Sequence, residues 1–195
     1  MNARKFVVAS FAASAALALG LALSGSASAA TAASGSAVVS ESSSFFQQAA
    51  AQGIYATPLP SATGSYSSAS GLVGTFPITS GTGSLYTATA ELQLGGSLLL
   101  VDVKTGRAAA FSQLVFDTYN DAITGVPVGG TTAVPLLDPS GALDAEAPSA
   151  TQTFTASDLD VDPAGASYLD SHLNTTFFTA GQSVGSLSVT YTPAS

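Results

Sequence analysis

The sequence predicts an all-β fold, an antiparallel β-sandwich or barrel with one or two short helices. Apolar and polar residues alternate over several short segments, as they do in half-buried strands. Gly- and Pro-containing turn signals separate these segments. The chain has 195 residues, of which 46% are hydrophobic, and a chain of this size can bury the core of one domain.

Residues 1–30 have the features of a secretory signal peptide. Arg4 and Lys5 form a basic start, 6–23 is an apolar run, and Ala-Ser-Ala at 27–29 fits a cleavage site. The alternative is an uncleaved membrane anchor. No second apolar stretch of spanning length follows, so we expect a secreted chain of roughly 165 residues with no membrane span after cleavage.

The charge balance excludes several function classes. Without 1–30, only Lys104 and Arg107 remain against twelve acids, which gives a net charge of −10. A surface of this sign repels nucleic-acid backbones and anionic lipid. The chain has no cysteine, which excludes disulfides, Cys-ligated metal centres and thiol nucleophiles. Its single histidine excludes any site that needs two imidazoles from one chain.

The segment after the signal is rich in Ser and Ala. This composition predicts a flexible tether over 31–52. Within it, 44–52 predicts a short helix that ends at Gly53. We expect the single β-rich domain to cover 53–195.

The clearest strand signal is the alternation of apolar and polar residues over 86–94. Gly95 and Gly96 then predict a two-residue hairpin turn, because glycine adopts a positive φ without steric cost. In the register of this hairpin, Leu92 faces Leu99.

The next segments continue the β pattern. A turn signal at 104–107 leads into a strand over 108–119 that is apolar on both faces. Over 151–161 the apolar residues change from even to odd positions, which predicts a bulge near Ser157 or two separate strands.

The last elements are a short helix and a strand. Asp162 predicts the N-cap and Pro163 the first turn of a helix over 164–173. The alternation over 186–192 predicts a final half-buried strand.

One acidic pattern suggests a metal site. Asp158, Asp160 and Asp162 form a D-x-D-x-D sequence, which resembles the start of a calcium loop. Such a loop continues with Gly and ends in a bidentate Glu, whereas Pro163 follows here. The three acids are therefore either weak calcium ligands or solvated strand residues followed by a helix cap.

No motif supports a specific enzyme. Residues 181–185 match the G-x-S-x-G pattern of serine hydrolases, which requires a helix after the Ser and a His later in the chain. Here a strand follows and His172 comes earlier, so we expect a turn and no enzymatic activity. A carboxylate-based hydrolase remains an alternative, since twelve acids allow many pairs.

The order of several segments resembles the HtaA family of secreted actinobacterial domains. The matching pieces are 75–79, 94–98, 111–117 and 164–189, within a stretch from 72 to 192. The resemblance implies a β-rich exported fold. As in known members of the family, it also implies haem binding through a Tyr with a supporting His.

The resemblance assigns residues to this haem site. The ligating Tyr falls in the N-terminal segment, where Tyr55 is the match, and the His before the glycine pair is replaced by Leu94. Our leading prediction is a secreted, non-enzymatic cell-surface or extracellular binding or structural module. Its partner is an unknown extracellular or cell-wall ligand, and no cofactor is expected. An HtaA-like haem-binding protein is the first alternative.

Overall fold

The computed structural model describes residues 31–67, 71–147 and 149–195, and it confirms an all-β fold with two short helices. The predicted signal peptide at 1–30 lies outside the described residues. In chain order the elements are β1 (Ser34–Glu41), α1 (Ser43–Gln52), β2 (Ile54–Leu59), β3 (Thr63–Ser67), β4 (Gly71–Thr82), β5 (Glu91–Leu94), β6 (Ser97–Asp102), β7 (Arg107–Asp117), β8 (Ala122–Pro127), β9 (Val134–Glu146), β10 (Gln152–Val161), α2 (Pro163–Leu173) and β11 (Ser183–Thr192).

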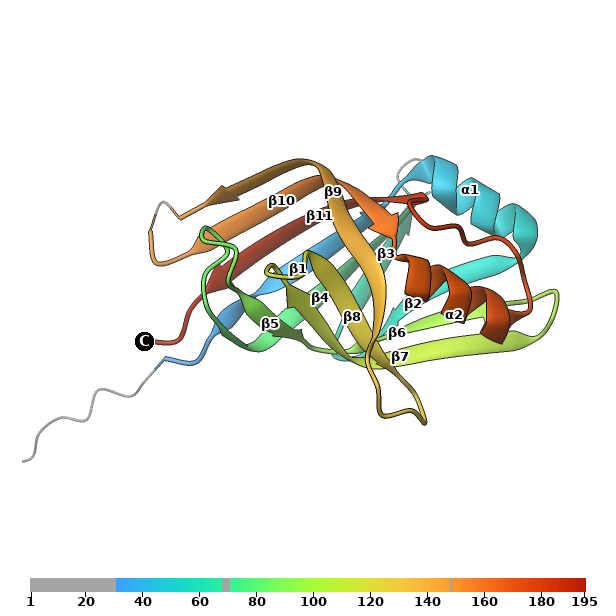
Figure 1. Ribbon diagram of the computed structural model, residues 1–195, viewed down its shortest axis with the longest axis horizontal. Coiled ribbons are helices and arrows are strands. Elements are labelled where there is room, and N and C mark those ends of the chain that lie inside the picture. Colours follow the sequence, from blue (N-terminus) through green and yellow to red (C-terminus); the bar gives the residue numbers. More distant parts are fainter. Residues whose placement is uncertain (1–30, 68–70, 148) are drawn as a thin grey trace, which may run out of the picture.

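Eight of these strands close into an antiparallel barrel. Their order is β7-β5-β4-β1-β11-β10-β9-β8, and β8 pairs back to β7. Three strands extend this barrel, because β6 pairs with β7, β2 pairs with β6, and β3 pairs with β4. Both helices lie toward one end of the molecule (Figure 1), where α1 packs against β2 and α2 packs against β9 and β7.

Strands β10 and β11 form the part of the wall that the sequence predicts best. Leu187, Val189 and Tyr191 are buried with at most 2% exposure, as the alternation predicts. The predicted bulge in β10 is confirmed, since the pairing of β10 with β9 shifts between Ala156 and Asp158. This bulge explains why the buried positions of β10 change from even to odd.

Both predicted helices are present, and side chains cap them. Ser42 Oγ accepts a hydrogen bond from Phe45 N at 3.2 Å, and α1 ends at Gly53 with φ of 86°. At α2, Asp162 Oδ1 accepts from Ala164 N at 2.6 Å. Each cap satisfies a backbone N–H that has no partner inside its helix.

The predicted tether is wrong for the segment that forms β1. This strand is part of the barrel wall, where it pairs with β4 on one side and β11 on the other, and Ala37 is fully buried. Thr31 and Ser195 also exchange backbone hydrogen bonds of 3.0 and 3.2 Å. Small side chains do not prevent a strand from forming when both neighbouring strands satisfy its backbone. The domain therefore begins near 31 and not at 53.

The predicted hairpin at Gly95 and Gly96 is also wrong. Strands β5 and β6 both run antiparallel to β7, so the chain does not reverse between them, and Leu92 does not face Leu99. The glycines instead form a bend within one strand path. Gly96 has φ of 89°, and a Cβ there would lie 2.5 Å from Ala62 N. A positive φ is needed at both a turn and a bulge, so the glycine pair alone does not separate them.

The chain reverses direction after β6, one strand later than predicted. Strands β6 and β7 form a hairpin whose turn is the one predicted at 104–107. The strand predicted over 86–94 begins only at Glu91, and Tyr86 is an exposed turn residue. Thr118 Oγ1 accepts a hydrogen bond from Ala90 N at 2.8 Å, and this fixes the turn against the end of β7.

Candidate functional site

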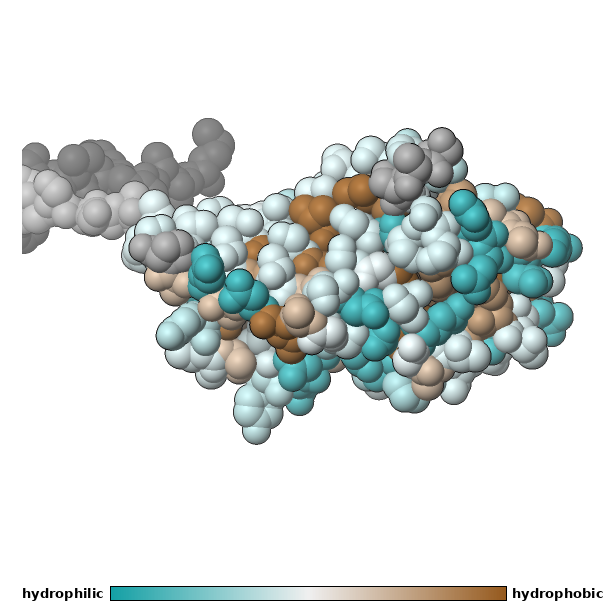
Figure 2. Space-filling view, turned by 90° about the horizontal axis from the view of Figure 1, so that it is seen from above, coloured by the Kyte–Doolittle hydropathy of each residue, from teal (hydrophilic) through white to brown (hydrophobic). Residues whose placement is uncertain are grey.

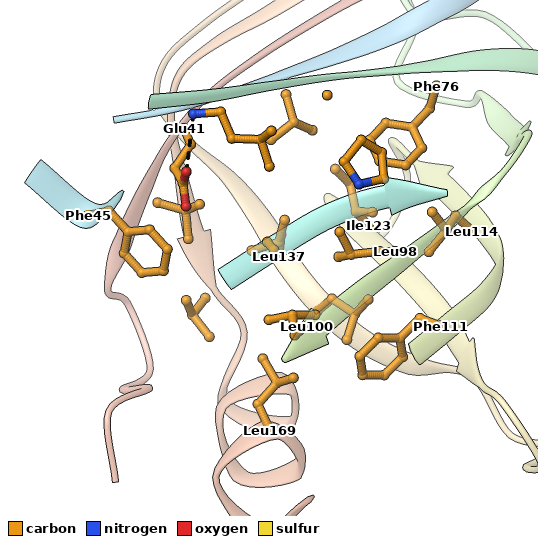
Figure 3. A pocket seen from close by; sticks show the side chains of 18 of the residues that line it. Glu41, Phe45, Phe76, Leu98, Leu100, Phe111, Leu114, Ile123, Leu137 and Leu169 are labelled. Carbon is orange, nitrogen blue, oxygen red and sulfur yellow. Dashed lines mark hydrogen bonds between the residues drawn. The ribbon is translucent and has the colours of Figure 1, made fainter. Parts of the chain in front are cut away.

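An apolar cavity of about 110 Å³ lies between the barrel, the β2–β6 extension and the two helices. Figure 3 shows Phe76 and Phe111 on one side of it and Phe45 on the other, with Leu169 of α2 below. Among the described residues that line the cavity, Glu41 is the single charged one. The cavity is therefore an apolar chamber with one ionisable group in its wall.

Glu41 reaches the cavity because β1 alternates. Ala37 and Val39 occupy the same inward phase of the strand, and Glu41 is the last residue of this series. Only 8% of Glu41 is exposed. Its Oε2 accepts a hydrogen bond from Leu72 N at 3.2 Å, drawn as a dashed line in Figure 3. Burial raises the pKa of Glu41, and the hydrogen bond from Leu72 partly opposes this rise.

The turn between β6 and β7 holds both helices that wall the cavity. Lys104 Nζ donates to the carbonyl of Ala51 at the end of α1, at 2.7 Å. Thr105 Oγ1 donates to the carbonyl of Leu173 at the end of α2, at 3.1 Å. Asp102 orders the turn by accepting from the backbone N–H of Lys104 at 2.7 Å. These contacts satisfy helix C-terminal carbonyls, which otherwise lack partners.

The outer surface differs from the cavity. The face shown in Figure 2 is mostly pale and polar, with apolar side chains in small separate groups. Within the described residues, no helix is long and apolar enough to span a bilayer. On the face shown, the apolar side chains are therefore less continuous than those that line the cavity.

Tyr55, the candidate haem ligand, points away from the cavity. It lies on β2 with 44% of its surface exposed, whereas its neighbour Ala56 lines the chamber. Leu94, which stands where the resemblance expects a His, lines the cavity and is buried. Neither of the two positions assigned by the resemblance therefore offers a haem ligand to the chamber.

The three candidate calcium ligands face different partners. Asp162 caps α2, and Asp158 accepts hydrogen bonds from Leu159 N and from the Ser183 hydroxyl. Asp160 pairs across the strands with Asp138. Within the described ranges, no group of three or more acidic or histidine side chains is arranged to hold a metal ion.

Sequence analysis did not anticipate the environment of Asp138. Burial raises the pKa of its carboxyl, and the negative charges of Asp162, Asp160 and Asp121 raise it further. Asp160 and Asp162 belong to the D-x-D-x-D pattern, but Asp121 and Asp138 come from two other segments, so sequence spacing gives no sign that all four gather.

The remaining motif residues form no catalytic arrangement. The turn predicted at 181–185 is already complete at Ser183, which begins β11, and the Ser183 hydroxyl donates to Asp158. His172 stacks on Tyr168 with ring centroids 3.8 Å apart, and its Nδ1 lies 2.9 Å from the carbonyl oxygen of Tyr168. This pair borders an open surface hollow beside the loop at 127–134.

Glu41 is the functional candidate that sequence analysis missed. The signal was present, because Ala37, Val39 and Glu41 share one parity in the segment Ala-Val-Val-Ser-Glu. An acid in the inward phase of a strand is a candidate for function, since buried carboxyls are rare unless they are paired. Because the segment is predicted to be a flexible tether, its inward-facing positions are not considered.

The fold resembles that of the C-terminal domain of HtaA from Corynebacterium glutamicum. The crystal structure of that domain matches with a TM-score of 0.56 and 14% sequence identity, over 85% of this chain and 99% of that chain. No family model and no curated protein sequence matches the chain. At this identity the likeness concerns the fold, and it confirms that the predicted resemblance to HtaA extends to three dimensions.

Proposed function

We propose that this chain is a secreted, non-enzymatic binding module that holds a small apolar ligand, or the apolar end of a larger one, in its internal cavity. One observation carries the proposal: the described residues that line the cavity are apolar apart from Glu41, whose carboxyl is buried. Apolar surface that a ligand covers in such a chamber favours binding, and one polar group fixes the ligand's orientation.

The cavity volume bounds the size of the ligand. An engineered apolar cavity of about 150 Å³ binds benzene, whereas pockets for drug-sized molecules measure about 300–1,000 Å³. A chamber of about 110 Å³ therefore suits a segment of about four carbon atoms next to a polar head. Larger molecules would enter with one end only.

Two further features support a binding protein that is exported and has no catalytic role. Hydrolysis by paired carboxylates needs a second acid near the first, and the described cavity lining supplies Glu41 alone. The signal-like segment at 1–30 and the absence of cysteine are compatible with export of a chain that folds through its core.

A titration with 1-butanol tests the proposal. In methyl-labelled mature protein, we expect saturable NMR shifts at Leu98 and Leu100, which line the cavity, and none at Leu85, which is buried elsewhere. Ala56→Leu places extra carbon atoms in the chamber and should abolish the shifts. Ala108→Leu adds the same atoms on the exposed side of β7 and should preserve them. A folded wild-type protein without saturable shifts at the cavity leucines would disprove the proposal.

The likeness to HtaA keeps haem as a second candidate. A haem macrocycle is much larger than benzene, so it does not fit a chamber of about 110 Å³. Haem would have to bind on the outer surface, where Tyr55 is exposed. We expect hemin to give no saturable shift of its Soret band with the mature chain. A saturable shift that Tyr55→Ala removes would replace our proposal with haem capture.

A further inference from the structure

The head group of the ligand is the next question, and the position of Glu41 limits the answer. Its carboxyl lies at the wall of an otherwise apolar chamber and receives a hydrogen bond from Leu72 N. A carboxylate in apolar surroundings is costly unless a positive charge or further hydrogen-bond donors approach it. A ligand with a donor head would supply these partners, while a carboxylate or phosphate head would place like charges together.

Within the part of the chain that the structure describes, no cationic side chain takes this role. Lys104 Nζ donates to the carbonyl of Ala51 at the end of α1, and Arg107 is exposed at the start of β7. His172 stacks on Tyr168 beside the surface hollow. None of these three residues lines the cavity.

The charge of the whole chain acts in the same direction. Twelve acids against Lys104 and Arg107 give the chain without 1–30 a net charge of −10. A field of this sign raises the local concentration of small cations and lowers that of anions. Long-range attraction and the local carboxyl therefore favour the same class of ligand.

We infer that the cavity selects a short alkylamine, or an alkylammonium group at the end of a larger molecule, with its cationic nitrogen at Glu41 and its carbon chain among Leu98, Leu100 and Phe111. This inference rests on the proposed function, because it specifies the ligand of the same cavity. A charge-assisted hydrogen bond is roughly twice as strong as a neutral one. We therefore expect n-butylamine to bind about tenfold more tightly than 1-butanol at neutral pH.

Three probes with equal chains and different heads test the inference. Calorimetric titration of the mature chain with n-butylamine, 1-butanol and butanoate should give the tightest binding for the amine and the weakest for butanoate. Glu41→Gln should remove the preference for the amine and leave 1-butanol bound. Glu91→Gln removes an exposed acid on β5 and should leave all three affinities unchanged.

A second measurement uses the wild-type protein alone, in case Glu41→Gln does not fold. The side-chain Cδ resonance of Glu41 should move when n-butylamine is added and move less with 1-butanol. Equal affinities for amine and alcohol, or an unmoved Glu41 resonance at saturation with the amine, would overturn the inference while 1-butanol binding kept the proposed function intact. If neither probe binds, the proposed function fails together with it.

Discussion

Truncating Phe111 should separate the two roles of the barrel interior, which are stability and ligand binding. Phe111 is fully buried, lines the cavity and contacts the ring of Tyr168 at a centroid distance of 5.3 Å. Phe116 lies on the same strand, is equally buried and contacts Phe154 at the same distance, but it does not line the cavity. The two residues therefore form a matched pair.

The stability cost should be similar for both truncations. Replacing a buried Phe by Ala costs about 3–5 kcal/mol. For a domain of this size each kcal/mol lowers the melting temperature by about 2–4 °C, so we expect a decrease of about 6–20 °C for Phe111→Ala and for Phe116→Ala. Far-UV circular dichroism follows the unfolding, since the chain has no Trp to serve as a fluorescent probe.

The effect on binding should differ between the two variants. Phe111→Ala enlarges the chamber, so a ligand with two more methylene groups can be buried. Each buried methylene contributes about 0.8 kcal/mol, and 1-hexanol should therefore gain about tenfold in affinity over the wild type. Phe116→Ala should leave the affinity for 1-hexanol unchanged. If both variants gain affinity equally, or if neither does, the assignment of the cavity as the binding site is wrong.

Four smaller perturbations test separate parts of the structure. Gly96→Ala should lower the unfolding free energy by at least about 1–2 kcal/mol, since φ is 89° and a Cβ would contact the backbone of Ala62; an unchanged urea midpoint would argue against the bend. Asp162→Ala should cost about 0.5–2 kcal/mol in the same assay through loss of the α2 cap. Tyr191→Phe should stabilise by about 1 kcal/mol, because within the described structure the buried hydroxyl has no hydrogen-bond partner. Glu41→Gln should raise the stability at pH 7. The native state binds the Glu41 proton more tightly than the unfolded chain, so wild-type stability falls as pH rises above the ordinary pKa of 4.5. A variant whose stability has the same pH dependence as the wild type would refute this.

The parts of the fold that could be predicted are those determined by local sequence. Asp162 and Pro163 specify the start of α2 through groups within three residues of each other, and the alternation in β11 shows which side chains face the core. The bulge of β10 is visible as a change of phase because the register shift moves every later side chain to the other face. No knowledge of the partner strand is needed for any of these.

The parts that could not be predicted depend on pairing between distant segments. Gly95 and Gly96 allow a bend or a reversal equally well, and only the position of β7 beside both β5 and β6 selects the bend. Likewise, β1 has few bulky side chains, so its composition predicts flexibility. Its eight residues become a strand because β4 and β11, distant in sequence, satisfy its backbone on both sides.

Because a tether has no inward-facing side, the incorrect prediction at β1 also gave no sign that Glu41 lines the cavity. The strand that corrects the fold therefore also places the candidate site. Once 34–41 is a strand, the alternation that points Ala37 and Val39 inward must also point Glu41 inward. A leucine at that position would complete an apolar wall without the cost of burying a carboxyl. The raised pKa of Glu41 means that this residue lowers the stability of the native protein at neutral pH. Glu41 opposes folding and is the only charged residue in the described lining of an apolar chamber, which is explained if its partner arrives with the ligand.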